Sequence, residues 1–233
     1  MTFGRAVIEA VGEQSQRLGS LIPVILDAKR GDIASTAMAY ARSAFITLGA
    51  HAVTLSPYLG KDSIDPFLTD REKGVFLLCK TSNPGAGDLQ DLPVLEPAPD
   101  VNQGNRAVQS PEGTAEAVQP PAGTDRTVQP LYLVVARLAQ SWNTSGNIGL
   151  VVGATQPEAL ARVRAVAPDL WFLAPGVGAQ GGDLEAALHA GLRADGKGML
   201  LPVSRSVSRA VDPAVAAAKL RDEIINIMYR RER

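Results

Sequence analysis

The sequence feature that most constrains the fold is an apolar run that ends abruptly in a cluster of charges. Residues 22–26 (IPVIL) have the composition of a buried strand. Residues 27–32 (DAKRGD) follow at once, and residues 33–48 after them have the apolar spacing of a helix. In α/β proteins the loops at the carboxyl ends of buried strands carry the chemistry. We therefore expect a functional site in residues 27–32.

The rest of the chain alternates between strand and helix patterns. We expect strands at 21–28, 52–56, 74–79, 147–153, 170–174 and 198–203, and helices at 4–18, 33–48, 63–68, 131–142, 157–166, 183–189 and from Asp212 to the basic end. This alternation predicts an α/β fold with a parallel sheet and helices outside it. Six strands are recognisable, whereas a closed (β/α)₈ barrel has eight.

One segment interrupts the alternation, at about residues 88–130. It is rich in Pro, Gly, Gln and Thr, and a ten-residue repeat recurs in it, with VQSP at 108–111, VQPP at 118–121 and VQP at 128–130. Three short Pro-rich copies cannot bury a core, so we expect a disordered or weakly ordered insertion in a single domain of residues 1–233. A proline-rich ligand for a partner protein is the alternative.

Composition excludes several classes of function. The 233 residues carry a net charge of −1, which gives no electrostatic footprint for nucleic acid or an acidic membrane. The chain has neither an apolar run near the roughly 20 residues of a membrane span nor the pattern of a signal peptide at its start. Cys79 is the single cysteine, which predicts a reducing, cytoplasmic setting, and its apolar strand favours a core position over a nucleophile. No metal-ligand cluster is visible.

The charged stretch itself suggests acid–base chemistry. Asp27 and Lys29 point to the same face of an extended chain, because side chains alternate with a period of two. A buried carboxylate beside an ammonium keeps both groups charged, and a lysine so placed can deliver a proton to a developing carbanion. Asp32 lies beyond Gly31 and can reach another subunit. The alternative is a salt-bridged surface turn.

Two further stretches could bind parts of a ligand. Residues 175–182 (PGVGAQGG) place four glycines after a strand and before a helix, as in a phosphate-binding loop, with Gln180 as an amide donor. Arg205 follows the last strand and can pair bidentately with phosphate. Residues 81–83 (TSN) offer hydroxyls and an amide to a polar ring edge. A flexible glycine loop and an ordinary turn are the respective alternatives.

Together these motifs resemble the orotidine 5′-phosphate decarboxylases, in particular the longer bacterial subgroup (type 2). Residues 27–36 (DAKRGDIAST) match the family signature D-x-K-x-x-D-I-x-x-T. Residues 81–85 (TSNPG), 151–155 (VVGAT), 175–182 and 204–205 (SR) follow in the family's order. The resemblance covers essentially the whole chain except the segment at about 88–130.

The resemblance implies a TIM (β/α)₈-type barrel that works as a homodimer. It implies decarboxylation of orotidine 5′-monophosphate to UMP and CO₂ in de novo pyrimidine biosynthesis, without metal or organic cofactor. By this similarity Lys29 protonates C6 of the pyrimidine, Asp27 lies near the departing carboxylate, and Asp32 completes the catalytic set. The implied substrate-binding residues are Ile33 and Thr36, which with Asp32 reach the partner subunit's site, Ser82 at the pyrimidine, Gln180 and Arg205 at the phosphate, and Pro175, Gly181 and Ser204.

The family has two further strands before this point, and the second carries a lysine that completes an alternating Lys-Asp-Lys-Asp network. No lysine precedes Lys29 in this sequence. The resemblance therefore predicts an N-terminally incomplete barrel with about six of its eight strands. Two alternative functions stay open. One is a truncated or degenerate fragment that at most binds a nucleotide monophosphate. The other is a related sugar-phosphate decarboxylase, because D-x-K-x-x-D also occurs in those enzymes.

Overall fold

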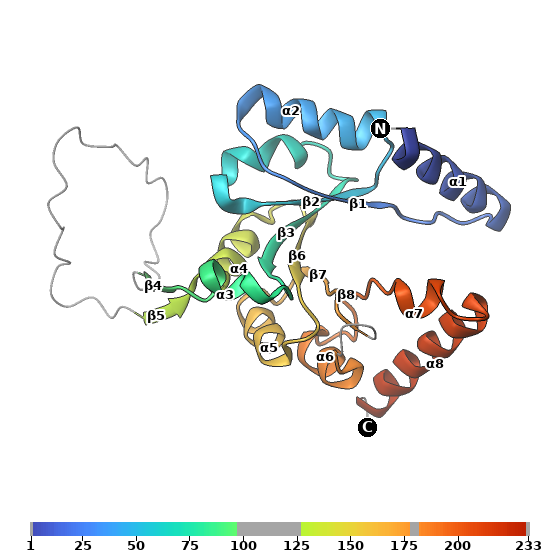
Figure 1. Cartoon of the computed structure of the whole chain (residues 1–233). Helices are drawn as coiled ribbons and strands as arrows, with labels where there is room; N and C mark the ends of the chain where they lie inside the picture. Colours follow the sequence, from blue (N-terminus) through green and yellow to red (C-terminus); the bar gives the residue numbers. More distant parts are fainter. Residues whose placement is uncertain (1, 97–126, 178–181, 232–233) are drawn as a thin grey trace, which may run out of the picture.

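The fold is a curved parallel sheet with helices on its outer side (Figure 1). The computed structural model describes residues 2–96, 127–177 and 182–231. The strands, in their order across the sheet, are β1 (Ile25–Arg30), β2 (Ala52–Leu55), β3 (Gly74–Lys80), β6 (Ile148–Val152), β7 (Trp171–Leu173) and β8 (Met199–Leu200). All neighbouring pairs are parallel, and β1 and β8 are the edges of the described sheet. The predicted TIM-barrel-type α/β class and the count of six strands are confirmed.

The helices alternate with these strands largely as predicted. They are α1 (Thr2–Leu18), α2 (Ala34–Arg42), α3 (Gly87–Gln90), α4 (Leu131–Trp142), α5 (Pro157–Val166), α6 (Leu184–Gly191), α7 (Arg205–Ser208) and α8 (Pro213–Arg231). Asp183 caps α6 by accepting from the amide of Ala186, and Asp212 caps α8 by accepting from Ala214 and Val215. In the described part of the chain, no helix is both long and apolar enough to cross a membrane.

Two predicted helices differ from the structure. The helix expected over 33–48 begins as α2 and ends in a π-helical turn, Ser43–Thr47. The helix expected over 63–68 is replaced by consecutive 3₁₀ turns, Pro57–Leu59, Lys61–Ser63 and Asp65–Phe67. Pro66 lies inside the expected helix and has no amide hydrogen to donate to the preceding turn, so a continuous helix over 63–68 is interrupted there.

The first strand also differs, because β1 begins later and ends later than the expected 21–28. Pro23 has no amide hydrogen, and the amide of Val24 donates to Nδ1 of His51 at 3.0 Å instead of to a strand. At the other end the Arg30 carbonyl accepts from the amide of Ser56 at 2.7 Å. Asp27, Lys29 and Arg30 are therefore part of β1, whereas Asp32 follows it.

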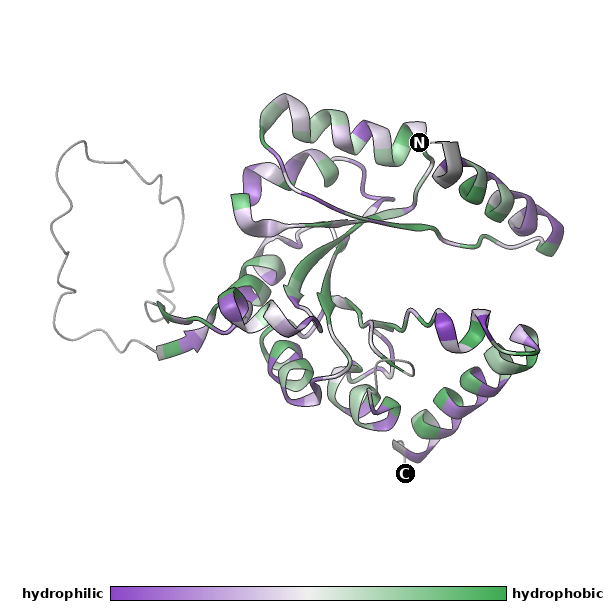
Figure 2. Ribbon diagram, in the orientation of Figure 1, coloured by the Kyte–Doolittle hydropathy of each residue, from purple (hydrophilic) through white to green (hydrophobic). Residues whose placement is uncertain are grey.

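Side chains alternate between two faces of the sheet, and this alternation separates the core from the inner face. Outward residues such as Val53, Leu77 and Leu150 are fully buried under the helices in the main core. A smaller apolar cluster on the inner face is built on Ala52, Phe76 and Val151. Figure 2 shows apolar colour along the strands and mixed colour on the helices. The inner face therefore has an apolar floor beneath the carboxyl ends of the strands.

The segment expected to be an insertion at about 88–130 has regular structure at its two ends. Strand β4 (Pro93–Glu96) pairs antiparallel with β5 (Thr127–Pro130), and α3 and β4 lie within the predicted range. The sequence analysis did not predict these elements, because Pro93 and Pro130 obscure the strand pattern. Residues 97–126, where most of the repeat falls, lie outside the described residues.

Candidate functional site

A pocket of about 470 Å³ lies at the carboxyl ends of the sheet strands. It is lined by residues from β1 and β2 and from the segments after β3, β7 and β8. Apolar inner-face side chains such as Ile25, Leu78 and Val151 line its floor. This is the position at which parallel α/β folds bind their ligands. The pocket therefore gathers stretches that lie far apart in the sequence.

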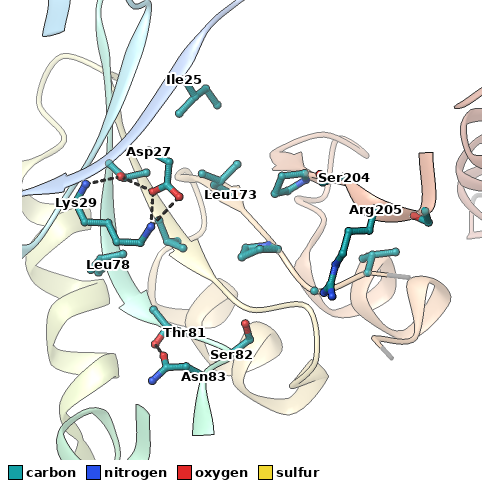
Figure 3. Close-up of a pocket in the computed structure, with 17 residues that line it drawn as sticks. Ile25, Asp27, Lys29, Leu78, Thr81, Ser82, Asn83, Leu173, Ser204 and Arg205 are labelled. Atoms are coloured by element: carbon teal, nitrogen blue, oxygen red, sulfur yellow. Dashed lines mark hydrogen bonds and ion pairs between the residues drawn. The ribbon is translucent and has the colours of Figure 1, made fainter. Parts of the chain in front are cut away.

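Asp27 and Lys29 form a tight ion pair on one wall of this pocket (Figure 3). The Lys29 ammonium lies 2.7 Å from both Oδ1 and Oδ2 of Asp27. The shared face predicted from the period of two is confirmed. The prediction of a buried carboxylate is wrong, because the side chains of Asp27 and Lys29 are 62% and 52% exposed. This exposure follows from their place on an edge strand of the described sheet.

The backbone around this pair is irregular. Leu26 is paired with Val53 and Arg30 with Leu55, so three residues of β1 stand opposite the single residue Thr54 of β2. Lys29 has φ +46°, in the left-handed region that non-glycine residues rarely occupy. The bulge re-aims the side chains of β1, as bulges near functional sites commonly do. No sequence pattern pointed to it, because no glycine marks it.

Thr54 is a pocket residue that the sequence analysis missed. It is 1% exposed, and its hydroxyl donates to Oδ1 of Asp27 at 2.8 Å. The same hydroxyl accepts from the amide of Lys29 at 2.9 Å. One signal could have found it. Thr54 is the single polar residue in the otherwise aliphatic strand β2 (AVTL) and shares the inward register of Ala52.

The hydrogen bonds set the electrostatics of Asp27. Partial burial raises the pKa of this carboxyl, but the bonds from Lys29 and Thr54 and the charge of Lys29 act in the opposite direction. The net result is a pKa of Asp27 below its ordinary value. Asp27 is therefore an anion at neutral pH, held against a cation at the mouth of the pocket.

The loop after β3 carries Thr81, Ser82 and Asn83 into the pocket. Gln90 holds this loop, because its Oε1 accepts from the Thr81 amide at 2.9 Å and its Nε2 donates to the Thr81 hydroxyl at 2.8 Å. The Thr81 hydroxyl in turn donates to Oδ1 of Asn83 at 2.7 Å. Thr81 holds the loop in place through these bonds, and Ser82 and Asn83 line the pocket as candidates for a ligand's polar ring edge.

A buried lysine at the end of β3 links the start of this loop to Asp91. The side chain of Lys80 is 5% exposed and donates to both carboxylate oxygens of Asp91 at 2.7 Å. Gly153, directly after β6, lets the loop approach closely, since a Cβ there would lie 3.0 Å from Cβ of Ser82. The sequence analysis did not identify Lys80, Gln90 or Asp91 as loop supports.

The opposite wall of the pocket comes from the segments after β7 and β8. Pro175, Ser204 and Arg205, all predicted site residues, line it together with Gly176 and Val177. Figure 3 shows Ser204 and Arg205 across the pocket from Asp27 and Lys29. Gln180 and Gly181 lie outside the described residues, so the predicted phosphate loop is described only at its two ends. Arg205 begins the short helix α7, where a loop was expected.

Three other predicted residues do not line this pocket. Asp32 and Ile33 lie between β1 and α2, and Thr36 lies in the first turn of α2. Ile33 and Thr36 are exposed, and Asp32 is half-buried. Asp32 accepts from the amide of Ile33 at 2.8 Å, and Ile33 is 57% exposed. The single chain therefore brings together Asp27, Lys29, Ser82, Pro175, Ser204 and Arg205 but leaves Asp32, Ile33 and Thr36 outside this set.

Cys79 and metal binding give no alternative site. Cys79 is 2% exposed in the main core and its sulfur donates to the Tyr132 carbonyl at 3.2 Å, which confirms the predicted core role. Burial raises the pKa of this thiol well above its ordinary value, so it is a poor nucleophile. Among the residues that the structure describes, no three His, Cys, Asp or Glu side chains are grouped to hold a metal ion.

Comparison with known proteins identifies the family. The model of the orotidine 5′-phosphate decarboxylase / HUMPS family matches residues 2–220. The chain is 49% identical to the orotidine 5′-phosphate decarboxylase of Roseiflexus castenholzii, over 87% of this chain and 66% of that protein. It is 47% identical to the enzyme of the same name from Thermomicrobium roseum, over 97% of this chain and 73% of that protein.

Solved structures agree with the sequence comparison. The Leishmania donovani OMP decarboxylase superposes with a TM-score of 0.71 at 50% identity, over 89% of this chain and 69% of that one. The chain therefore belongs to the orotidine 5′-phosphate decarboxylase / HUMPS family.

Proposed function

We propose that this chain decarboxylates orotidine 5′-monophosphate to UMP and CO₂ in de novo pyrimidine biosynthesis. The observation that carries the proposal is the ion pair of Lys29 with both oxygens of Asp27 at a pocket of about 470 Å³. Relatives that are 49% and 47% identical bear the name of this enzyme, and the chain spans 66% and 73% of their length.

The ion pair supplies the two functions that the reaction needs. Breaking the bond between C6 and the carboxyl carbon leaves an electron pair on C6, and the Lys29 ammonium is the acid that protonates it. Asp27, an anion because its pKa is lowered, disfavours the negative charge of the substrate carboxylate beside it and so favours loss of neutral CO₂. The proton, electron pair and leaving group balance without a cofactor.

The other pocket residues bind the parts of the substrate that do not react. Ser82 contacts the pyrimidine, and Arg205 with Gln180 binds the phosphate, with Pro175, Gly181 and Ser204 completing the walls. Arg205 lies across the pocket from Lys29, at the far end of a nucleotide-sized ligand (Figure 3). Because the phosphate is remote from C6, its binding energy can organise the charged pair without touching the reacting bond.

The proposal extends to the assembly and the domain organisation. We propose a cytoplasmic homodimer in which Asp32, Ile33 and Thr36 enter the partner's site. The exposure of Ile33 and Thr36, and the absence of all three residues from the lining of their own pocket, support this. We also propose a single domain over residues 1–233 that carries the repeat segment as an insertion, since β4 and β5 return the chain to α4.

Turnover by the purified chain tests the proposed function. We expect UMP formation from orotidine 5′-monophosphate, reduced roughly 10²–10⁴-fold by Lys29→Ala because the general acid is lost. Lys61→Ala is the matched control, since Lys61 pairs with Asp65 on another surface. Absence of turnover in the unsubstituted chain, with binding of UMP retained, would instead support the non-catalytic nucleotide-binding alternative.

A ligand panel separates the remaining alternative. We expect UMP to raise the melting temperature of the chain more than pentulose or hexulose phosphates do. Arg205 and the phosphate loop serve any phosphate, whereas Ser82 and Asn83 offer donors and acceptors to a planar ring edge. Equal shifts for all these ligands would count against a nucleotide as the preferred ligand, and larger shifts with the sugar phosphates would favour a sugar-phosphate decarboxylase.

A further inference from the structure

Thr54 occupies an unusual place for a polar side chain. All four residues of β2 are buried, and the other three are Ala52, Val53 and Leu55. Thr54 itself is 1% exposed. A buried hydroxyl without partners is costly, so a hydroxyl at such a position must have a specific hydrogen-bonding role.

Both partners of this hydroxyl belong to the proposed catalytic pair. Oγ1 of Thr54 donates to Oδ1 of Asp27 at 2.8 Å and accepts from the backbone amide of Lys29 at 2.9 Å. The Lys29 ammonium donates to both oxygens of the same carboxylate at 2.7 Å. The Thr54 hydroxyl is thus hydrogen-bonded to the backbone of Lys29 and to the carboxylate that the Lys29 side chain contacts.

The backbone bond has a structural reason. In the bulge of β1, three residues stand opposite Thr54 alone, so the regular pairing of β1 with β2 is interrupted there. At this interruption the amide of Lys29 donates to the Thr54 hydroxyl. Lys29 also has φ +46°. This conformation costs free energy and persists only where the surrounding structure holds it in place.

We propose that Thr54 is a positioning residue, whose hydroxyl holds the β1 bulge and thereby directs the Asp27 carboxylate and the Lys29 ammonium into the pocket. The proposal rests on the proposed function only for its effect on turnover. Its structural part, the hold on the Lys29 amide, stands independently. A misplacement of reacting groups by about 1 Å can cost a hundredfold in rate, so the hydroxyl matters although it does not react.

The kinetic test compares Thr54→Val with Thr54→Ser. Valine keeps the shape and removes the hydroxyl, and we expect kcat to fall at least about tenfold with KM changed less than about threefold. Serine keeps the hydroxyl, and we expect kcat within about threefold of the unsubstituted chain. Thr69→Val is the matched control, because its hydroxyl donates to the Pro66 carbonyl in an exposed turn. Equal losses in the Val and Ser variants would overturn the proposal.

Amide hydrogen exchange provides a readout that does not depend on turnover. We expect the Lys29 amide to exchange at least about tenfold faster in Thr54→Val than in the unsubstituted chain, with amides of β3 unchanged. If valine prevents folding, Thr54→Ser and Thr54→Ala give the same comparison, since they differ by the hydroxyl alone. Unchanged exchange at Lys29 would refute the proposal. A chain without turnover but with faster exchange would refute only the proposed function.

Discussion

At the scale of single residues, Asp27 is held by donors from its own strand and from the next one. Lys29 donates from β1 and Thr54 from β2, and both lower the pKa of the Asp27 carboxyl against the effect of partial burial. The identity and shared face of Asp27 and Lys29 were predictable from spacing alone. Thr54 was not, because its role depends on a bulge that only the pairing of β1 with β2 reveals.

The lowered pKa of Asp27 predicts a pH-dependent contribution to stability. A carboxyl whose folded pKa lies below its unfolded value of about 3.9 stabilises the fold above that value and ceases to do so as the pH falls through the folded pKa. We therefore expect the stability difference between the unsubstituted chain and Asp27→Asn to shrink from about pH 5 to about pH 2.5. Urea unfolding at both pH values measures it. A difference independent of pH would contradict the lowered pKa.

Arg205 is expected to act through binding and not through the chemical step. Arg205→Gln removes a cation that can pair bidentately with phosphate, so we expect KM for orotidine 5′-monophosphate to rise roughly tenfold or more. The inhibition constant of UMP checks the same loss without turnover. An unchanged inhibition constant would place the phosphate elsewhere.

At the scale of elements, the amino-terminal ends of β7 and β8 are tied together by one arginine. Arg164 of α5 donates to the carbonyls of Gly191, Leu170 and Gly198 at 2.7–3.2 Å. It also lies 3.6 Å from the centre of the Phe172 ring. Burial, with the nearby charge of Arg193, lowers the pKa of Arg164 to about 10, so it remains charged at neutral pH.

Replacing this arginine tests its structural role. Arg164→Lys keeps the charge but loses the planar fork that reaches several carbonyls at once, so we expect a loss of about 1–3 kcal/mol in the free energy of unfolding. Arg221→Lys is the matched control, because Arg221 is exposed and pairs with its neighbour Asp222. Equal urea midpoints for both variants would show that Arg164 does not tie these elements.

Gly153 sets the approach of the loop after β3. Gly153→Ala adds a Cβ at 3.0 Å from Cβ of Ser82 and 3.2 Å from its amide nitrogen, so the loop must move away from the pocket. We expect UMP to bind roughly tenfold more weakly, by the same sensitivity to misplacement. Gly12→Ala in α1, where no atom lies within 4 Å of the added Cβ, is the control. Calorimetric titration with UMP measures the dissociation constant of both variants, and equal values would contradict this role of Gly153.

Elements were predicted well where local pattern and tertiary pairing agree. The strands β2, β3 and β6 are buried runs, and α5 is marked by Pro157 at its start. The prediction failed where long-range contacts override the pattern. Strand β1 was shifted by the ring of His51, and the β4–β5 pair depends on a partner more than 30 residues away in sequence. Such contacts leave no local signal.

At the scale of the whole molecule, the two edges of the described sheet are poor templates for further strands. β8 is two residues long, and β1 carries Asp27, Lys29 and Arg30 along with its bulge. Short edge strands, charges and bulges are the features by which natural sheets limit edge-to-edge association. Asp27 and Lys29, for which we propose catalytic roles, therefore also make the exposed edge of β1 a poor template for strand pairing.

The β4–β5 pair predicts that the repeat segment is not needed for the fold. Because Glu96 is paired with Thr127, residues 97–126 can be replaced by a two-residue Asn-Gly turn that suits such a hairpin. We expect the melting temperature to change by only a few degrees, since loop-closure entropy varies slowly with length. Differential scanning calorimetry measures it, and a loss of cooperative unfolding would show that the segment is part of the folded unit.

The buried position of Cys79 allows unfolding of the chain to be measured by labelling its thiol. It is the one thiol in the sequence, and it lies 2% exposed in β3 at the centre of the sheet. A thiol reagent can reach it only when the core opens, so the rate of labelling at increasing urea concentration reads the free energy of that opening without an added probe. The same experiment, repeated with UMP present, would measure how much a bound ligand raises the free energy of that opening.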